Sequence, residues 1–141
     1  MTAGDVAPGP AEKPVPVIML VEDDVFVRFT TAEMLREQGF GVVEAVDAGE
    51  ALALLAAGRP VDLVLSDIRM PGDMDGIGLT FAVKKLRPDL PIVLVSSHLP
   101  PDTIHCGDDF LAKPYGADEL FATVERAMGD EWKSERNRKT S

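Results

Sequence analysis

The feature that most constrains the fold is a repeated alternation between short apolar runs and longer segments with helical periodicity. Residues 17–21, 61–66 and 92–95 are largely apolar runs of strand length, which is typical of strands buried on both faces of a sheet. Residues 25–35 and 117–127 instead repeat apolar side chains every three or four positions, which is typical of one helix face. The alternation predicts an α/β doubly wound domain with a parallel sheet.

Weaker patterns complete this alternation. We predict further strands at residues 42–45 and 110–112, and further helices at residues 47–57 and 77–87. In the first helix, one predicted apolar face is formed by Val25, Phe29, Ala32 and Leu35.

Composition divides the 141 residues into three segments. Residues 1–16 are small residues and proline without periodicity, so we predict a flexible N-terminal extension. Residues 17–129 hold all the predicted strands and helices and form one domain. Residues 130–141 form a charged C-terminal tail.

The overall composition excludes several classes of protein. A formal net charge of −10 disfavours a nucleic-acid binder, which normally has a basic face. A single cysteine excludes an internal disulfide and suits a reducing compartment. The chain has no apolar stretch near the roughly 20 residues that span a membrane, and its N-terminus lacks the pattern of a signal peptide. We therefore expect a cytoplasmic protein without membrane contact.

Polar side chains follow four predicted strands at the points where the strands end. Glu22 and Asp23 follow the first strand, Asp67 the third, Ser96 the fourth and Lys113 the fifth. Open α/β sheets bind their ligands at the carboxyl ends of their strands. The sequence therefore predicts one site that combines carboxylates, a hydroxyl and an amine.

The residue types at this edge indicate the chemistry. Crowded carboxylates repel one another unless a cation lies among them, and oxygen ligands without histidine or cysteine favour Mg²⁺ over zinc. A carboxylate can also act as a nucleophile and form an aspartyl phosphate. Asp24 suits a different role, as the cap of the first helix.

Four motifs in order, "LVEDD", "LVLSDIRMPGDMDG", "VSS" and "AKPY", resemble the receiver domain of bacterial two-component response regulators. The resemblance covers residues 17–129. It implies a flavodoxin-like, five-stranded parallel sheet in the order 2-1-3-4-5 with five helices.

The resemblance also implies roles for the acidic residues. Asp67 would accept a phosphoryl group from a histidine kinase or a histidine phosphotransfer protein. Glu22, Asp23 and Asp67 would hold Mg²⁺, and the backbone carbonyl of Arg69 would complete the protein ligands of the metal.

Other positions match residues that contact or report the phosphoryl group in this family. Lys113 matches the lysine that contacts it, and Ser96 matches the switch hydroxyl. Phe110 matches the aromatic side chain whose rotamer reports activation. His98 and Arg69 occupy positions that tune dephosphorylation.

Two departures from the family pattern affect loops. The stretch "PGDMDG", residues 71–76, is one residue longer than the common form. Only 16 residues separate Ser96 from Lys113, and they include two consecutive prolines, so we predict that the fourth helix is short or absent. Pro114 follows the lysine where the family usually has a cis peptide bond.

The first functional hypothesis is a stand-alone, single-domain response regulator whose phosphorylation controls the binding of a downstream protein. We expect a monomer or weak dimer and no enzymatic turnover beyond slow autodephosphorylation. The alternatives are a pseudo-receiver that binds partners without phosphorylation and a receiver excised from a hybrid histidine kinase. A phosphatase with an aspartate nucleophile is disfavoured, since it commonly needs a second acid where Arg69 stands.

Overall fold

The computed structural model describes residues 15–97 and 107–129. Within these residues, the chain forms a five-stranded sheet in the order β2-β1-β3-β4-β5 with every pairing parallel. The strands are β1 (Val17–Val21), β2 (Gly41–Ala45), β3 (Leu63–Asp67), β4 (Ile92–Ser96) and β5 (Asp109–Ala112). The helices are α1 (Val25–Glu37), α2 (Ala48–Ala56), α3 (Gly76–Leu86) and α4 (Ala117–Met128). The predicted fold class and strand order are confirmed.

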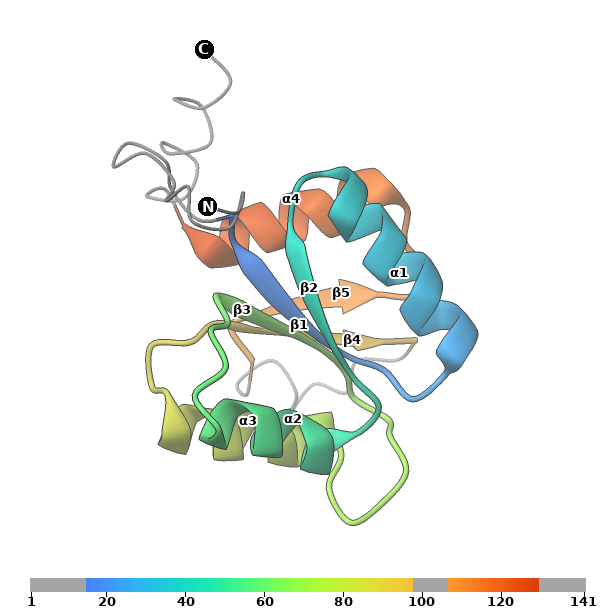
Figure 1. Cartoon of the computed structure of the whole chain (residues 1–141). Helices are drawn as coiled ribbons and strands as arrows, with labels where there is room; N and C mark the ends of the chain where they lie inside the picture. The colour runs from blue at the N-terminus through green and yellow to red at the C-terminus, as the bar shows by residue number, and fades with distance from the viewer. Residues whose placement is uncertain (1–14, 98–106, 130–141) are drawn as a thin grey trace, which may run out of the picture.

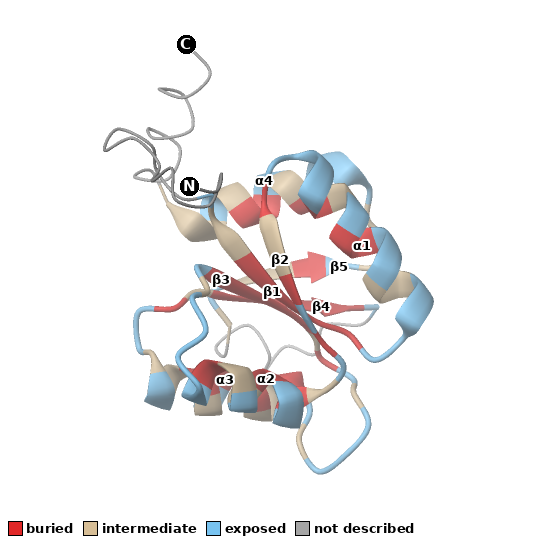
Figure 2. Ribbon diagram, viewed as in Figure 1, coloured by how far each residue is buried: buried red, intermediate tan, exposed pale blue. Residues whose placement is uncertain are grey.

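Helices cover both faces of the sheet (Figure 1): α2 and α3 lie on one side, and α1 and α4 lie on the other. Successive residues of a strand point to opposite faces, so β1 supplies both cores. Met19 and Val21 join the cluster under α2 and α3, whereas Ile18 and Leu20 join the cluster under α1 and α4. Burial is therefore concentrated in the strands (Figure 2).

The predicted apolar face of α1 is correct only in its C-terminal half. Ala32 and Leu35 are completely buried, but Val25 is 67% exposed and Phe29 is 62% exposed. The periodicity located the helix correctly, but the buried face is formed by Thr31, Ala32 and Leu35. Val27 and Arg28 are partly buried, so the face that meets the sheet is rotated away from Val25 and Phe29. The N-terminal part of α1 thus leaves large apolar side chains at the surface.

Carboxylates cap three helices at the edge where the strands end. Asp24 accepts hydrogen bonds from the N–H groups of Phe26 and Val27 at the start of α1, at 2.9 and 3.1 Å. Asp47 caps α2 and Asp75 caps α3 in the same way. The predicted capping role of Asp24 is confirmed, because a side-chain oxygen satisfies N–H groups that have no partner within the helix.

The boundaries of β3 differ from the prediction. The strand begins at Leu63 rather than at residue 61, and its last residue is Asp67. Asp62 uses its carboxylate to accept a hydrogen bond from the Val17 N–H at 2.7 Å, and the pairing with β1 runs from Leu63 onward.

The predicted shortening of the helix between β4 and β5 concerns residues 98–106, which lie outside the described residues. The described part of the chain does contain a fourth helix, α4, which is the final helix predicted at residues 117–127. The predicted extension and tail lie almost wholly outside the described ranges as well. No helix in the described ranges is both long and apolar enough to cross a membrane.

Candidate functional site

Three carboxylates meet at the carboxyl edge of the sheet. One ligand oxygen from each of Glu22, Asp23 and Asp67 lies within 4.8 Å of the others. The grouping follows from the strand order, because β1 and β3 are neighbours and both end at this edge. Glu22 is 5% exposed, Asp67 is half-buried and Asp23 is exposed. Such a group of oxygen donors is suited to a hard divalent cation.

Lys113 brings a positive charge to this cluster from the end of β5. Its Nζ atom lies 3.2 Å from Oδ2 of Asp67 and 3.6 Å from Oε1 of Glu22. The Lys113 N–H also donates to the Ser96 carbonyl at 3.0 Å, which fixes the backbone of the lysine beside β4. The ammonium therefore partly compensates the three carboxylates.

Burial and mutual repulsion shape the ionisation of the cluster. Burial raises the pKa of Glu22, and the Asp67 charge adds to the rise, although the Asp24 N–H and Lys113 oppose it. Burial likewise raises the pKa of Asp67 against the opposing effect of Lys113, with Asp23 adding to the rise. Burial alone would lower the pKa of Lys113, but the two buried carboxylates outweigh it and the net change is upward. The site thus holds more negative charge than its lysine neutralises, which favours a bound cation.

A cavity of about 420 Å³ opens beside the cluster. It is lined by Asp67, Arg69, Ser96, Ser97 and Lys113. The cavity gives a phosphoryl-sized group access to the Asp67 carboxylate, with the lysine and a buried serine on its walls. Sequence analysis assigned four of these five residues to one site, and the fifth, Ser97, follows directly in the motif "VSS".

Among the other predicted positions, Arg69 lines the cavity, whereas Phe110 is not one of its lining residues. Phe110 is half-buried on β5 and packs against the core cluster under α2 and α3. The Arg69 side chain is exposed, and the role of its carbonyl as a metal ligand stays a prediction. His98 lies outside the described residues. The peptide bond between Lys113 and Pro114 is cis, as the resemblance implied.

A close backbone contact supports the Asp67 end of β3. Gly76, the first residue of α3, donates its N–H to the Ile68 carbonyl at 2.7 Å. A Cβ atom on Gly76 would lie 2.8 Å from the Ile68 Cα and would also collide with the Asp67 carbonyl oxygen. Only glycine lets the helix begin this close to the strand end.

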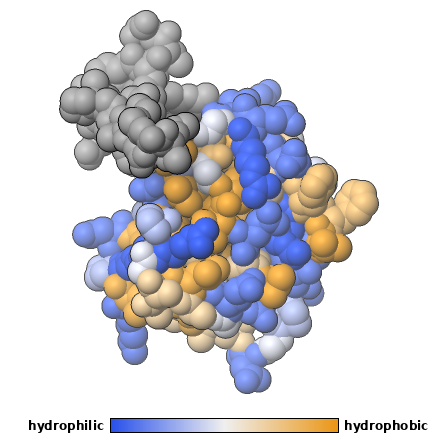
Figure 3. All heavy atoms as spheres, viewed as in Figure 1, coloured by the Kyte–Doolittle hydropathy of each residue, from blue (hydrophilic) through white to orange (hydrophobic). Residues whose placement is uncertain are grey.

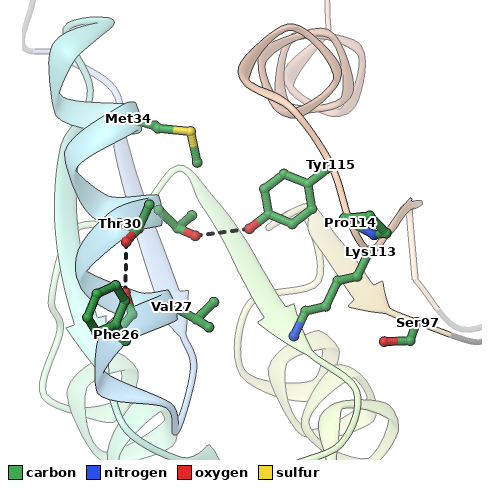
Figure 4. A pocket seen from close by; sticks show the side chains of 9 residues that line it. Phe26, Val27, Thr30, Met34, Ser97, Lys113, Pro114 and Tyr115 are labelled. Carbon is green, nitrogen blue, oxygen red and sulfur yellow. Dashed lines mark hydrogen bonds between the residues drawn. The ribbon is translucent and has the colours of Figure 1, made fainter.

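Sequence analysis missed an apolar groove between α1 and the segment after β5. It is lined chiefly by Phe26, Val27, Met34, Pro114 and Tyr115 (Figure 4). The Tyr115 hydroxyl lies 3.0 Å from the Thr31 hydroxyl and links the two walls. The motif "AKPY" contains Tyr115, but no local pattern pairs it with a threonine 84 positions away.

The groove and the acidic site are continuous, since Ser97 and Lys113 line both. The family model of the response regulator receiver domain matches residues 18–125.

The chain belongs to this family. Receiver domains bind Mg²⁺ at an acidic pocket and interact with histidine kinases. The position of the acidic cluster in this receiver is consistent with that pocket.

Curated relatives of this receiver are much longer proteins. The C4-dicarboxylate transport transcriptional regulatory protein DctD of Rhizobium meliloti is 41% identical over 117 residues, which cover 79% of this chain and 25% of DctD. The DNA-binding transcriptional regulator NtrC of Salmonella typhimurium is 36% identical over 117 residues, again 79% of this chain and 24% of the relative. The chain therefore spans about a quarter of the length of the curated relatives that it matches.

Solved receivers share the fold over nearly their whole length. The receiver domain of NtrX from Brucella abortus is 36% identical with a TM-score of 0.72, and the match covers 79% of this chain and 97% of that one. The response regulator TrrA of Thermotoga maritima, solved in complex with Mg²⁺ and BeF, is 28% identical with a TM-score of 0.74 and coverages of 80% and 99%.

Proposed function

We propose that this receiver accepts a phosphoryl group on Asp67 in a Mg²⁺-dependent reaction and that phosphorylation controls its binding to a downstream protein. The observation that carries the proposal is the contact between the Lys113 ammonium and the Asp67 carboxylate, 3.2 Å apart, within the acidic cluster. This geometry combines a nucleophile, a neutralising cation and a metal-compatible set of oxygens. Phosphoryl transfer needs such positioning and charge neutralisation more than covalent assistance.

In the proposed reaction, an Asp67 carboxylate oxygen attacks the phosphorus of a phosphohistidine on the donor protein. The new O–P bond forms as the N–P bond breaks, and the imidazole leaves with the electron pair of that bond. Lys113 is placed to neutralise charge on the phosphoryl oxygens. Glu22, Asp23 and Asp67 would hold Mg²⁺, with the Arg69 carbonyl as a further ligand. The bound ion would supply positive charge for the oxygens of the transferred group.

The proposed switch uses Ser96, which is buried at the end of β4 and lines the cavity. A hydrogen bond from a hydroxyl to a charged phosphoryl group contributes roughly 1.5–3 kcal/mol, which is about a 10- to 150-fold shift in equilibrium. A change from 1:99 to 99:1 requires about 10⁴-fold. Contacts from Lys113 or a partner must therefore contribute to a complete switch.

The groove beside the site offers a docking surface for the phosphodonor protein. Val25, Phe26 and Phe29 are 67%, 78% and 62% exposed on the part of α1 that adjoins it. Figure 3 shows apolar side chains projecting over this end of α1. Because the groove leads into the acidic site, Phe26→Ala should slow transfer from a phosphohistidine protein and leave phosphorylation by acetyl phosphate unchanged. Equal slowing of both reactions would count against docking here.

We further propose a single-domain form in the cytoplasm, with a histidine kinase or phosphotransfer protein upstream. The net charge of −10 supports output through protein contacts rather than nucleic acid. The size of the protein made from its native gene tests the single-domain form. A product longer than 141 residues would instead favour a receiver within a larger regulator or hybrid kinase.

The chemistry itself is tested by intact-mass spectrometry after incubation with acetyl phosphate. We expect a single phosphoryl adduct on the native protein with Mg²⁺, and none with EDTA or with Asp67→Asn. No adduct under conditions that label a control receiver would favour the pseudo-receiver alternative. Steady turnover of a generic phosphoester would instead indicate an enzyme, which the proposal does not expect.

A further inference from the structure

Arg28, in the second turn of α1, links the acidic site to β2. Its Nη1 atom donates to the backbone carbonyl oxygen of Glu22 at 2.8 Å, and its Nε atom donates to Oε1 of Glu44 at 3.2 Å. The Arg28 side chain is only 14% exposed. Its contact with the Glu22 carbonyl is partly buried, whereas Glu44 is exposed. A guanidinium suits such a position because its rigid fork donates in two fixed directions.

The carbonyl that Arg28 binds belongs to the peptide unit between Glu22 and Asp23. A peptide unit is planar and includes the next Cα atom, so fixing its carbonyl also fixes the direction of the Asp23 N–Cα bond, which lies in the same plane. The Glu22 N–H is fixed on its other side by the Ala45 carbonyl at 3.0 Å. Oε2 of Glu22 accepts from the Asp24 N–H at 3.1 Å. Arg28 therefore supplies the constraint on the link between the two adjacent acids.

We propose that Arg28 is a positioning residue for cation binding, which holds the peptide unit joining Glu22 and Asp23 so that both carboxylates are directed into the acidic cluster. The proposal rests on the cation site of the proposed function. Arg28 acts through the backbone and touches neither the phosphoryl group nor, in this arrangement, the carboxylates of the cluster.

A neighbouring arginine provides a matched control. Arg36 binds the other oxygen of Glu44, Oε2, at 3.1 Å, and its side chain is 43% exposed. Removing Arg36 therefore disturbs the same ion-pair network and removes the same formal charge, but leaves the contact between Arg28 and the Glu22 carbonyl in place.

The test compares Mg²⁺ affinity in the native protein, Arg28→Met, Arg28→Lys and Arg36→Met by NMR titration of backbone amides with MgCl₂. Loss of a group that orients metal ligands commonly weakens affinity 10- to 100-fold, and we expect about tenfold for Arg28→Met. Arg28→Lys keeps one donor without the fork, so we expect a partial rescue to about threefold weaker binding. Arg36→Met should bind Mg²⁺ as the native protein does.

Equal weakening by Arg28→Met and Arg36→Met, or native affinity in Arg28→Met, would overturn the positioning role. If Arg28→Met does not fold, as judged by its amide spectrum, native affinity in Arg28→Lys would overturn the role and threefold weaker binding would support it. Phosphorylation by acetyl phosphate is measured on the same samples. A native protein that binds Mg²⁺ but acquires no phosphoryl group would refute the proposed function, while the affinity series still decides the role of Arg28.

Discussion

Replacing Asp67 with asparagine is expected to make the cation-free protein more stable, although it removes the proposed phosphoryl acceptor. The substitution keeps the shape of the side chain and removes one charge from a cluster with three carboxylates and one ammonium. Glu22 and Asp23 repel Asp67, whereas Lys113 attracts it. The sign of the effect depends on which of these contributions is larger.

The distances allow this comparison to be made. The carboxylate oxygens of the cluster lie within 4.8 Å of one another. At an effective dielectric constant of about 20, two like unit charges at this upper limit repel by about 3.5 kcal/mol. Two such repulsions exceed the attraction of about 5 kcal/mol expected for Lys113 at 3.2 Å. Burial of Asp67 acts in the same direction as the repulsion. Because Asp23 is exposed and screened by solvent, we expect a net stabilisation of about 1–2 kcal/mol.

Thermal unfolding in EDTA at neutral pH measures this effect. For a domain of this size we expect a rise of about 4–8 °C in the melting temperature of Asp67→Asn. Asp89→Asn, which removes an exposed charge elsewhere, serves as the control for net charge and should change the melting temperature little. Added Mg²⁺ should stabilise the native protein more than Asp67→Asn, because the cation relieves the same repulsion.

The pH dependence gives a second check on the sign. The folded-state pKa of Asp67 is raised, with burial as the largest cause. The folded state therefore holds the proton of Asp67 more tightly than the unfolded state does. The stability that this gives is fully present below the unfolded pKa of about 4, and it is lost as the pH rises through the folded pKa and Asp67 ionises. The advantage of Asp67→Asn should accordingly grow from acidic to neutral pH. A less stable Asp67→Asn protein in EDTA at neutral pH would refute the reasoning.

Three further predictions test the surroundings of the site. Gly76→Ala should destabilise the fold by about 1–3 kcal/mol and slow phosphorylation. Gly49→Ala in α2 is the control, because its new Cβ meets only ordinary contacts, and it should stabilise the fold by up to about 1 kcal/mol. Urea unfolding measures the stability of both variants. Thr31→Val and Tyr115→Phe each remove one hydroxyl of the hydrogen bond across the groove. A double-mutant cycle should therefore show a coupling of about 0.5–1.5 kcal/mol between the two substitutions. Additive effects of the two substitutions on stability would contradict this prediction. Burial raises the pKa of Asp109, but the hydrogen bond from Arg126 on α4 outweighs this effect and the net change in the pKa is downward. Asp109→Asn should therefore lower the stability of the fold by up to about 1 kcal/mol at neutral pH. This loss should disappear as the pH falls through the folded pKa, and a loss that does not change with pH would count against the ion pair.

The strands and the acidic edge could be predicted because both depend on local sequence. Continuous apolar runs locate buried strands, and the first polar residue after each run lies near the edge where parallel strands end. Glu22, Asp67, Ser96 and Lys113 were all located in this way. Their separation in the chain did not matter, since the parallel order of the sheet brings the strand ends together.

Features that depend on contacts between distant segments could not be predicted. The exposure of Val25 and Phe29 depends on which side of α1 faces the sheet, which the spacing of apolar residues along this helix did not specify correctly. The hydrogen bond between Thr31 and Tyr115 joins residues with no shared local pattern. The contact of Arg28 with the Glu22 carbonyl was missed for a related reason, because a backbone acceptor leaves no signature in the sequence.

The central claim is that Asp67, and no other carboxylate of the cluster, receives the phosphoryl group. The most direct test is to treat the protein with acetyl phosphate and Mg²⁺, reduce the acyl phosphate with borohydride, and locate the modified residue by peptide mass spectrometry. The account predicts that the reduced side chain lies at Asp67 and is absent from samples prepared with EDTA. Modification at Glu22 or Asp23, or no modification in a protein that binds Mg²⁺, would contradict it.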